Sequence, residues 1–337
     1  MSAKYLELSR SELELRAQEA YEIYHECQVC PHACKVDRTQ GQTGYCGQTD
    51  LLSISSSVRH FGEEPPLVGT NGVGNLFVTA CNMRCDYCQN FQISQLWSKQ
   101  VDKISPERTW QNTAEQMLLL QEKGVHFIGW VSPSHVVPGL LKSLSIAREM
   151  GLTIPIIYNT NAYDGLATLK LLDGVVDVYL PDLKYSDSAK AREISHIHEY
   201  KEFSQQAVLE MYRQVGPLEL SEDGLAESGL LVRHLILPDN LAGTWETLCF
   251  IALELSPSVP LSLMSQYRPV HKVNEPLSRE ITRDEYESAI SMARELGFEN
   301  LYLQSMETAV HNLPDFNDKE NPFPLDRAHN QDIVRTQ

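Results

Sequence analysis

The stretch NLFVTACNMRCDYCQNFQIS, residues 75–94, begins as an apolar strand candidate and runs directly into a group of three cysteines. Cys81, Cys85 and Cys88 follow the strand with the spacing C-x3-C-x2-C. Three thiolates are one fewer than a closed tetrahedral metal site needs, but they can hold three irons of a [4Fe–4S] cube and leave the fourth iron open. The spacing therefore predicts a reactive metal centre.

The same strand opens a regular alternation of apolar and helical segments. Ser105-Pro106 is typical of a helix start, and Gly124, Gly151 and Gly297 stand where helical stretches end. Apolar strands alternating with helices indicate parallel pairing covered by helices, so we expect an α/β fold, a (β/α) barrel of the partial (β/α)6 type. The strand candidates are residues 75–79, 125–131, 153–159, 175–180, 230–237, 259–266 and 300–304.

Short polar motifs follow several of these strands. In a barrel, functional residues lie at the C-terminal ends of strands and in the loops that follow them. The cysteine loop and the motifs SPSH, NTN, DLK and QYRP all stand at such ends. This placement predicts one shared site.

The charge balance of the chain is acidic. Lys and Arg number 28 against 45 Asp and Glu, which gives a formal net charge of 28 − 45 = −17 and argues against nucleic acid as a partner. No apolar run reaches the roughly 18–20 residues that a membrane span needs, and the N-terminus has no apolar signal-peptide core. We expect a cytoplasmic protein without a membrane partner.

A second group of cysteines lies upstream, with the spacing C-x2-C-x3-C-x11-C: Cys27, Cys30, Cys34 and Cys46. Clustered cysteines in a reducing cytoplasm are typical of metal ligands rather than disulfides. Four thiols make a complete set, which predicts a closed site for zinc or for a second iron–sulfur cluster. A structural role is favoured because a short polar segment needs a metal to hold one shape. His25 and His32 are further candidate ligands.

The expected organisation has three parts. Residues 1–74 comprise a helix over 9–26, the cysteine-rich segment and a Gly/Pro-rich loop, and Ser11 with Glu14 predicts a capping box on the helix. Residues 75–310 form the barrel. Residues 311–337 form a C-terminal tail.

The cysteine triad, with an aromatic residue before its last cysteine, resembles that of the radical S-adenosylmethionine (SAM) superfamily. Over most of residues 27–325 the chain is more closely similar to proteins related to pyruvate formate-lyase-activating enzyme. The segments that carry this likeness are HFGEEPPLVGTNGVG with the cysteine loop, YNTNAY, VDVYLPDLKYSD, LLVRHLILP, LMSQYRP and PDFNDKENPF. The resemblance implies a barrel of radical SAM type, a [4Fe–4S] cluster on the triad and SAM on its open iron.

The resemblance also implies roles for single residues. Tyr87 would lie near the adenine, and Asp182 with Lys184 matches the D-x-K motif near the SAM carboxylate and ribose. At the place of the superfamily's GGE-type segment the chain has Gly129, Trp130 and no acid, so Ser132, Ser134 or backbone carbonyls would replace some contacts to the SAM amino group. Further candidates are Asn159, Asn161 and His271.

The implied activity is reductive cleavage of SAM to a 5′-deoxyadenosyl radical that abstracts a hydrogen atom, with glycyl radical formation on a partner enzyme or peptide as the favoured reaction. An external one-electron donor such as flavodoxin or ferredoxin would supply the electron. Two alternatives stay open: a radical SAM enzyme acting on a small molecule or modified peptide, and a non-catalytic iron–sulfur protein that retains the fold.

Overall fold

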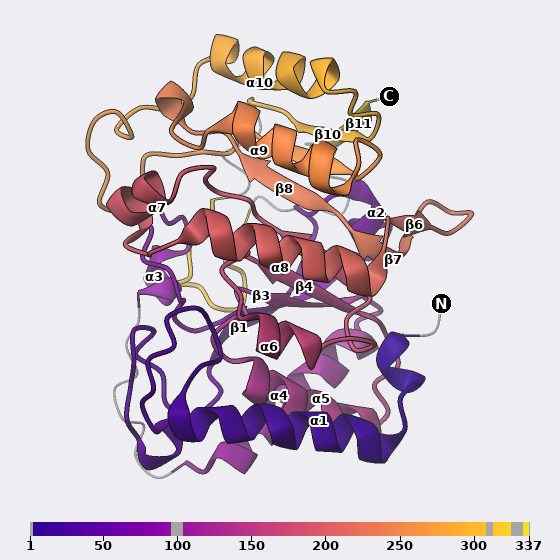
Figure 1. The fold of residues 1–337 in the computed structure, drawn as a ribbon. Coiled ribbons are helices and arrows are strands. Elements are labelled where there is room, and N and C mark those ends of the chain that lie inside the picture. Colours follow the sequence, from indigo (N-terminus) through magenta and orange to yellow (C-terminus); the bar gives the residue numbers. More distant parts are fainter. Residues whose placement is uncertain (1–2, 96–103, 308–312, 325–332, 337) are drawn as a thin grey trace.

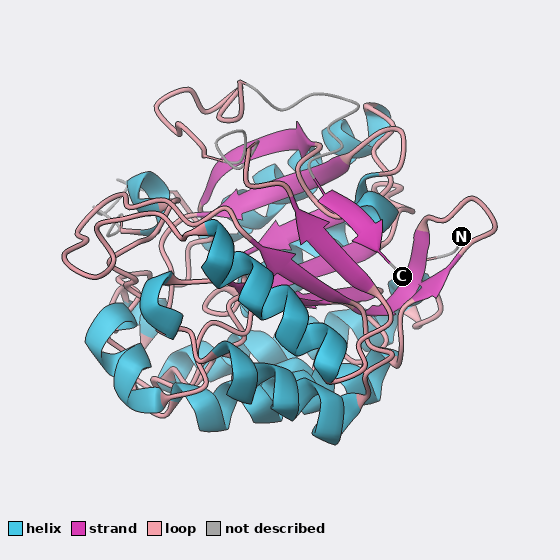
Figure 2. Cartoon of the chain, turned by 90° about the horizontal axis from the view of Figure 1, so that it is seen from above, coloured by secondary structure: helices cyan, strands magenta, loops and turns pink. Residues whose placement is uncertain are grey.

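The computed structural model describes residues 3–95, 104–307, 313–324 and 333–336. Its centre is a curved sheet with helices outside it (Figures 1 and 2). Within the described residues, parallel pairing leads from β2 through β3, β4 and β5, and from β8 through β9 to β10. The bounds are β2 (Val73–Val78), β3 (Ile128–Val131), β4 (Ile156–Thr160), β5 (Val178–Pro181), β8 (Val232–Leu235), β9 (Leu261–Met264) and β10 (Leu301–Gln304).

The sheet does not close into a full barrel. Between β5 and β8 the structure has an isolated parallel bridge from Asp182 to Arg233. The outer edges are the antiparallel strands β1 (Ile54–His60), next to β2, and β11 (Ile333–Thr336), next to β10. The partial barrel expected from the sequence is confirmed. Strand β1 lies within the first 74 residues, so the sheet begins before the segment 75–310.

The strand expected at residues 230–237 is two strands. β7 (Ala226–Leu230) pairs with β5 and with the short β6 (Glu219–Leu220), whereas β8 begins at Val232 and pairs with β9. Gly229 has a φ of 126°, and a Cβ there would lie 2.3 Å from the carbonyl oxygen of Pro217. The close approach of the two backbones requires glycine, and the chain changes neighbours just after it.

Of two helix caps predicted from the sequence, one agrees with the structure and one does not. Ser105 caps α4 (Pro106–Glu122), where it accepts a 3.4 Å hydrogen bond from the Arg108 amide. The first long helix, α1 (Arg10–Glu22), is capped by Ser9, which accepts from the Glu12 amide at 3.1 Å. The capping box expected from Ser11 and Glu14 is therefore wrong, because the helix is capped two residues earlier, at Ser9.

The outer layer packs α1 against α5 and α5 against α4, and it buries a continuous apolar core against the sheet (Figure 1). The remaining long members are α5 (Val137–Glu149), α8 (Tyr200–Val215) and α10 (Arg283–Glu295). Shorter helices are α2 (Pro65–Val68), α3 (Phe91–Ser94), α6 (Leu166–Lys170), α7 (Ser188–Ser195) and α9 (Thr244–Phe250).

A C-terminal segment, residues 313–324, covers the side of the sheet near β1 and β2. The ring centroid of Phe316 lies 5.2 Å from that of Phe77, and the ring of Phe323 lies 4.3 Å from that of His60. Ser56 donates a 2.7 Å hydrogen bond to the carbonyl oxygen of Lys319. These contacts hold the segment against the open side of the barrel.

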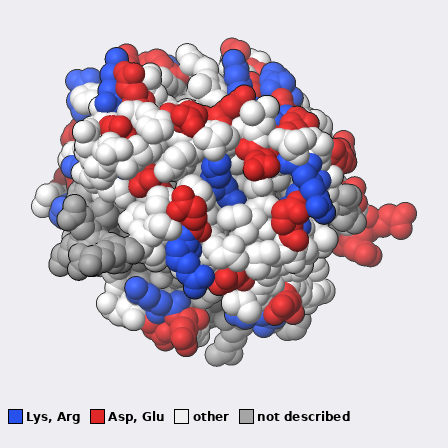
Figure 3. All heavy atoms as spheres, turned by 90° about the horizontal axis from the view of Figure 1, so that it is seen from below, with Lys and Arg blue, Asp and Glu red and all other residues white. Residues whose placement is uncertain are grey.

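The formal net charge of the chain is −17. The face seen from below carries acidic and basic side chains interspersed, without a broad patch of one sign (Figure 3). In the part of the chain that the structure describes, no helix combines the length and the apolar character that crossing a membrane requires.

Candidate functional site

The cysteine triad lies in the loop that follows β2. The chain turns sharply after the strand at Ala80, which has a φ of 65°. Beyond it, the amides of Arg84 and Asp86 donate to the carbonyl oxygens of Ser195 and Ile194 at 3.1 and 2.9 Å. The end of α7 therefore holds the loop in place. All eight cysteines are free, so the disulfide alternative is excluded.

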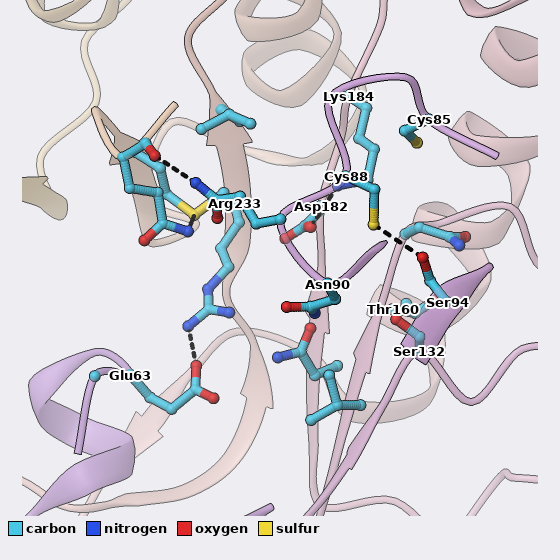
Figure 4. A pocket seen from close by; sticks show the side chains of 18 of the residues that line it. Glu63, Cys85, Cys88, Asn90, Ser94, Ser132, Thr160, Asp182, Lys184 and Arg233 are labelled. Atoms are coloured by element: carbon cyan, nitrogen blue, oxygen red, sulfur yellow. Dashed lines mark hydrogen bonds and ion pairs between the residues drawn. The ribbon is translucent and has the colours of Figure 1, made fainter. Parts of the chain in front are cut away.

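All three triad cysteines line a cavity of about 200 Å³ inside the partial barrel. Figure 4 shows Cys85, Cys88 and Lys184 on one side of this cavity and Glu63 on the opposite side, with Arg233 between them. Strand ends and the loops behind them supply the wall. Its other residues include Tyr87, Ser132, Asn159, Thr160, Asn161, Asp182, Gln266 and Gln304.

Hydrogen-bond donors surround the triad sulfurs. Ser195 donates its hydroxyl to Cys85 at 3.0 Å, and the Met83 amide and the Asn161 side-chain amide each donate to Cys81 at 3.4 Å. The Cys88 sulfur lies 3.1 Å from the Ser94 hydroxyl oxygen. Donors of this kind stabilise thiolates that bind a metal centre.

Cys85 is buried and Cys81 and Cys88 are partly buried, and removal from solvent affects the ionisation of their thiols. Desolvation raises the pKa of Cys81 to about 12 and that of Cys85 to about 11, although the nearby Lys184 ammonium acts in the opposite direction. Binding of iron, which requires thiolates, therefore releases protons and needs a cation such as Lys184 nearby.

Asp182 and Lys184 lie together at the C-terminal end of β5, where sequence reasoning expected them. The Lys184 ammonium donates to an Asp182 carboxylate oxygen at 2.7 Å, and both residues line the cavity. Burial lowers the pKa of Lys184, but attraction to Asp182 and to Cys85 outweighs it and leaves the pKa raised. Lys184 is thus a buried cation at the cysteine end of the cavity.

Tyr87, Ser132 and Asn159 also reach the cavity. Tyr87 is buried and accepts a 3.1 Å hydrogen bond from the Tyr185 hydroxyl. Ser132 has a φ of 57°, and its amide donates to the carbonyl oxygen of Asn159 at 2.9 Å. The structure therefore brings these three candidates to the same wall as the triad.

Gly129 and Trp130 are placed elsewhere, contrary to the expectation that they contact SAM. Neither lines the cavity, and Trp130 is fully buried in the apolar core. Gly129 pairs with Asn75 on β2, and a Cβ at Gly129 would lie 2.1 Å from the Asn75 side-chain oxygen. The glycine is needed for packing between β2 and β3.

Gly129→Ala is expected to lower the free energy of unfolding by about 1–3 kcal/mol, because the added methyl group has no room beside Asn75. Urea unfolding measures the loss. In an Asn75→Ala background the same substitution should cost less, since the obstructing amide is gone. An equal cost in both backgrounds would contradict this explanation.

His271 does not line the cavity either. Its ring stacks on Phe91 at a centroid distance of 4.9 Å, and it is not among the cavity residues. The neighbouring Lys272 amide donates to the carbonyl oxygen of Asp86 at 2.9 Å. His271 thus lies beside the triad loop without lining the cavity, and its expected role as a SAM-binding residue stays a prediction.

The structure adds a charged group that sequence reasoning missed. Arg233 on β8 donates to both carboxylate oxygens of Glu64, at 2.8 and 2.5 Å, and also to Glu63. All three are buried and line the cavity. An arginine inside the apolar run LLVRHLIL was the available signal, because a central strand carries a charge only where a partner neutralises it.

Burial raises the pKa of Glu63, but attraction to Arg233 and His60 outweighs it and lowers the pKa to about 2. Glu63 is therefore ionised at neutral pH. Asn75 also donates to Glu63, at 2.7 Å. Glu63, Glu64 and Arg233 together form a buried charged cluster at this end of the cavity.

The second cysteine group lies outside this cavity. Cys27, Cys30, Cys34 and Cys46 line a small gap of their own, together with Arg38. His25 lies at the surface beside Thr39, with 3.2 Å between its ring nitrogen and the hydroxyl oxygen. Across the described ranges, no three Cys, His, Asp or Glu side chains are close enough to bind one metal ion.

The triad nevertheless fits a [4Fe–4S] cluster. The thiolates of a cube bind different irons, so they stand farther apart than the ligands of one ion. Three cysteines that face a common cavity, with outer donors and a buried cation, match this requirement.

The fold and the site define an α/β protein with a partial barrel and a cysteine triad at the end of its first parallel strand. No model of a known protein family matches the chain. It is similar to two uncharacterized proteins of Methanocaldococcus jannaschii: MJ0674, 28% identical over 299 residues that cover 86% of this chain and 80% of the relative, and MJ0808, 24% identical over 298 residues that cover 82% and 80%.

Two solved structures show a more distant likeness. TYW1 with a bound lysine-pyruvate adduct has a TM-score of 0.45 at 11% identity and covers 74% of this chain and 80% of that one. HydG, a maturase of the [FeFe]-hydrogenase, has a TM-score of 0.47 at 12% identity and covers 96% and 68%. The assignment of a function therefore depends on the site itself.

Proposed function

We propose that the protein is a radical SAM enzyme. The observation that carries the proposal is the C-x3-C-x2-C triad, which lines a cavity enclosed by the partial barrel. Cys81, Cys85 and Cys88 would hold a [4Fe–4S] cluster with one iron open to SAM. When bound and reduced by an external donor, the cluster would supply one electron to the sulfonium of SAM, and cleavage of the C5′–S bond would give methionine and a 5′-deoxyadenosyl radical for hydrogen abstraction.

The residues around the cavity fit the binding of SAM. Lys184 places a buried positive charge where a carboxylate would bind, and Asp182 fixes its position. The Tyr87 ring forms part of the wall and is suited to contact an adenine. Phe77, Val131 and Phe323 give the cavity an apolar part of its wall, and they pack in one cluster with Phe316 of the C-terminal segment.

The test is anaerobic reconstitution with iron and sulfide, followed by a chromatographic assay for 5′-deoxyadenosine and methionine with dithionite and SAM. The two products should form in equal amounts and only with reductant. A protein with an EPR-verified [4Fe–4S] cluster that neither binds SAM nor cleaves it would sink the proposal and favour a non-catalytic iron–sulfur protein.

For the substrate we propose a glycine of a partner enzyme or peptide, with the activase-like motifs as support. Reduced protein with SAM and a candidate partner should then produce the glycyl radical doublet in EPR. A second candidate, a small molecule, is favoured by the buried charges of Glu63, Glu64 and Arg233 in the cavity wall. Consumption of SAM driven by a small molecule without any protein partner would support this candidate instead.

A further inference from the structure

The cysteine-rich segment, residues 27–46, contacts the loops after three neighbouring strands. The carbonyl oxygen of Val29 accepts a 2.8 Å hydrogen bond from Thr168, beyond β4. Arg38 donates to the carbonyl oxygen of His135, beyond β3, at 2.7 Å. His32 reaches Asn82 in the triad loop, beyond β2. The segment thus lies at the same end of the barrel as the triad.

Each of the four sulfurs in the segment has an N–H group beside it. The Tyr45 amide donates to Cys34 at 3.4 Å. The amides of His32 and Gln48 lie near Cys30 and Cys46, and the Arg38 guanidinium lies near Cys27, where they favour the thiolates. N–H groups beside all four sulfurs are typical of thiolates that bind one metal centre, because each sulfur then shares its negative charge.

The arrangement of the four cysteine sulfurs distinguishes between the two metal groups considered for this site, a zinc ion and a [4Fe–4S] cluster. A tetrahedral zinc ion would draw four sulfurs to about 2.3 Å from its centre. In the described residues no three ligand-type side chains lie within reach of one ion, and a gap of about 10 Å³ remains among the four cysteines, Arg38 and their neighbours. Sulfurs that do not gather around one point fit the separate irons of a cube better than a single zinc ion.

Arg38 supplies the charge that such a group needs. Its side chain is 1% exposed, and its guanidinium lies 4.0 Å from the centre of the Tyr24 ring. A [4Fe–4S] core with four thiolates is an anion, and a fixed buried cation beside Cys27 compensates part of that charge.

We propose that Cys27, Cys30, Cys34 and Cys46 hold a second, closed [4Fe–4S] cluster and that His32 couples this site to the triad loop. The second half rests on the proposed function. The Nε2 atom of His32 lies 2.8 Å from the carbonyl oxygen of Asn82, so it carries the proton and donates. His32 stands between Cys30 and Cys34, and Asn82 follows Cys81 directly.

Further contacts join the cysteine-rich segment to the triad loop. The His32 ring stacks on Tyr45 at 3.7 Å, and the Arg84 guanidinium of the triad loop lies 4.1 Å from the centre of the same tyrosine ring. Arg84 also donates to the carbonyl oxygen of Tyr45 at 2.7 Å. His32 is therefore a positioning residue that acts through the triad loop.

The occupant is tested in a variant with Cys81, Cys85 and Cys88 all replaced by alanine. We expect about four irons per chain and the EPR signal of a reduced [4Fe–4S] cluster that SAM does not change. A further Cys34→Ala substitution should remove this iron. Bound zinc without iron overturns the proposal. If the triple variant fails to fold, the wild type decides, with about eight irons for two clusters or about four for one.

The coupling is tested with His32→Ala, His32→Gln and the surface control His25→Ala. His32→Ala should keep its full iron content but weaken SAM binding about tenfold, measured by the shift of the triad cluster's EPR signal. His32→Gln, which retains a donor, should restore binding, and His25→Ala should behave as wild type. Unchanged spectra and affinity in His32→Ala overturn the coupling. The iron analysis does not depend on SAM cleavage. The proposal of a second cluster can therefore be overturned while the proposed radical SAM function stands, and the reverse is also true.

Discussion

Cys85→Ala is expected to abolish the formation of 5′-deoxyadenosine and to lower the iron content by about four atoms per chain. The Cys85 sulfur is 8% exposed, accepts from Ser195 and faces the same cavity as Cys81 and Cys88. The described cavity wall contains no further cysteine that could replace it. Two remaining thiolates cannot hold a cube with a single open iron.

The matched control is Cys249→Ala. Cys249 lies in α9 on the outer layer and does not line the cavity, so iron content and SAM cleavage should equal those of the wild type. Iron by colorimetric assay and product by chromatography measure both variants. Cleavage at the wild-type rate in Cys85→Ala would overturn the assignment of the triad.

Arg233→Met is expected to lower the free energy of unfolding by about 3–5 kcal/mol at neutral pH, because it leaves two buried carboxylates without their cation. Glu63 and Glu64 are 9% and 0% exposed and take most of their hydrogen bonds from Arg233. Urea unfolding measures the effect. Arg283→Met, in an exposed pair with Glu287, is the control and should change stability by less than about 1 kcal/mol.

The pH dependence separates this explanation from a simple loss of packing. In the wild type the pKa of Glu63 is lowered to about 2, so its contribution is present above the unfolded value of about 4.3 and is lost as the pH falls toward 2. In Arg233→Met burial remains without the cation, so the pKa of Glu63 rises. The variant should gain stability on acidification from pH 7 to 5, and a constant difference from wild type would contradict the charge argument.

The sequence predicted the parallel strands and their helices because apolar runs and helix caps are local signals. It did not predict the break between β7 and β8, since the change of partners at Gly229 depends on the approach of Pro217 from elsewhere in the chain. β1 was missed for a related reason: its residues ISSSVRH are mostly polar, and its pairing with β2 supplies the order that the segment lacks by itself.

In the candidate site, too, the residues with local sequence signals were predicted and those that depend on distant contacts were not. Cysteine spacing predicted the triad, and the D-x-K motif predicted the pair of Asp182 and Lys184, which the structure brings to one cavity. Gly129 and Trp130 occupy a motif position, but successive residues of a strand point to opposite faces: Trp130 packs in the apolar core, and Gly129 lies against Asn75 and does not reach the cavity. Glu63 and Arg233 are 170 positions apart in the sequence, and only the fold joins them.

The covering of the cavity by its own C-terminal segment has a consequence for how the protein is loaded. Phe323 and Ile333 line the same cavity as Cys81, yet they are the last parts of the wall to leave the ribosome. The cysteines of a nascent chain are therefore synthesised before residues 313–324, so this part of the cavity wall is still missing when the thiols first leave the ribosome. An iron–sulfur cluster would reach the cysteines most easily in that interval. We therefore expect the cluster to be inserted before residues 313–324 pack against the cavity.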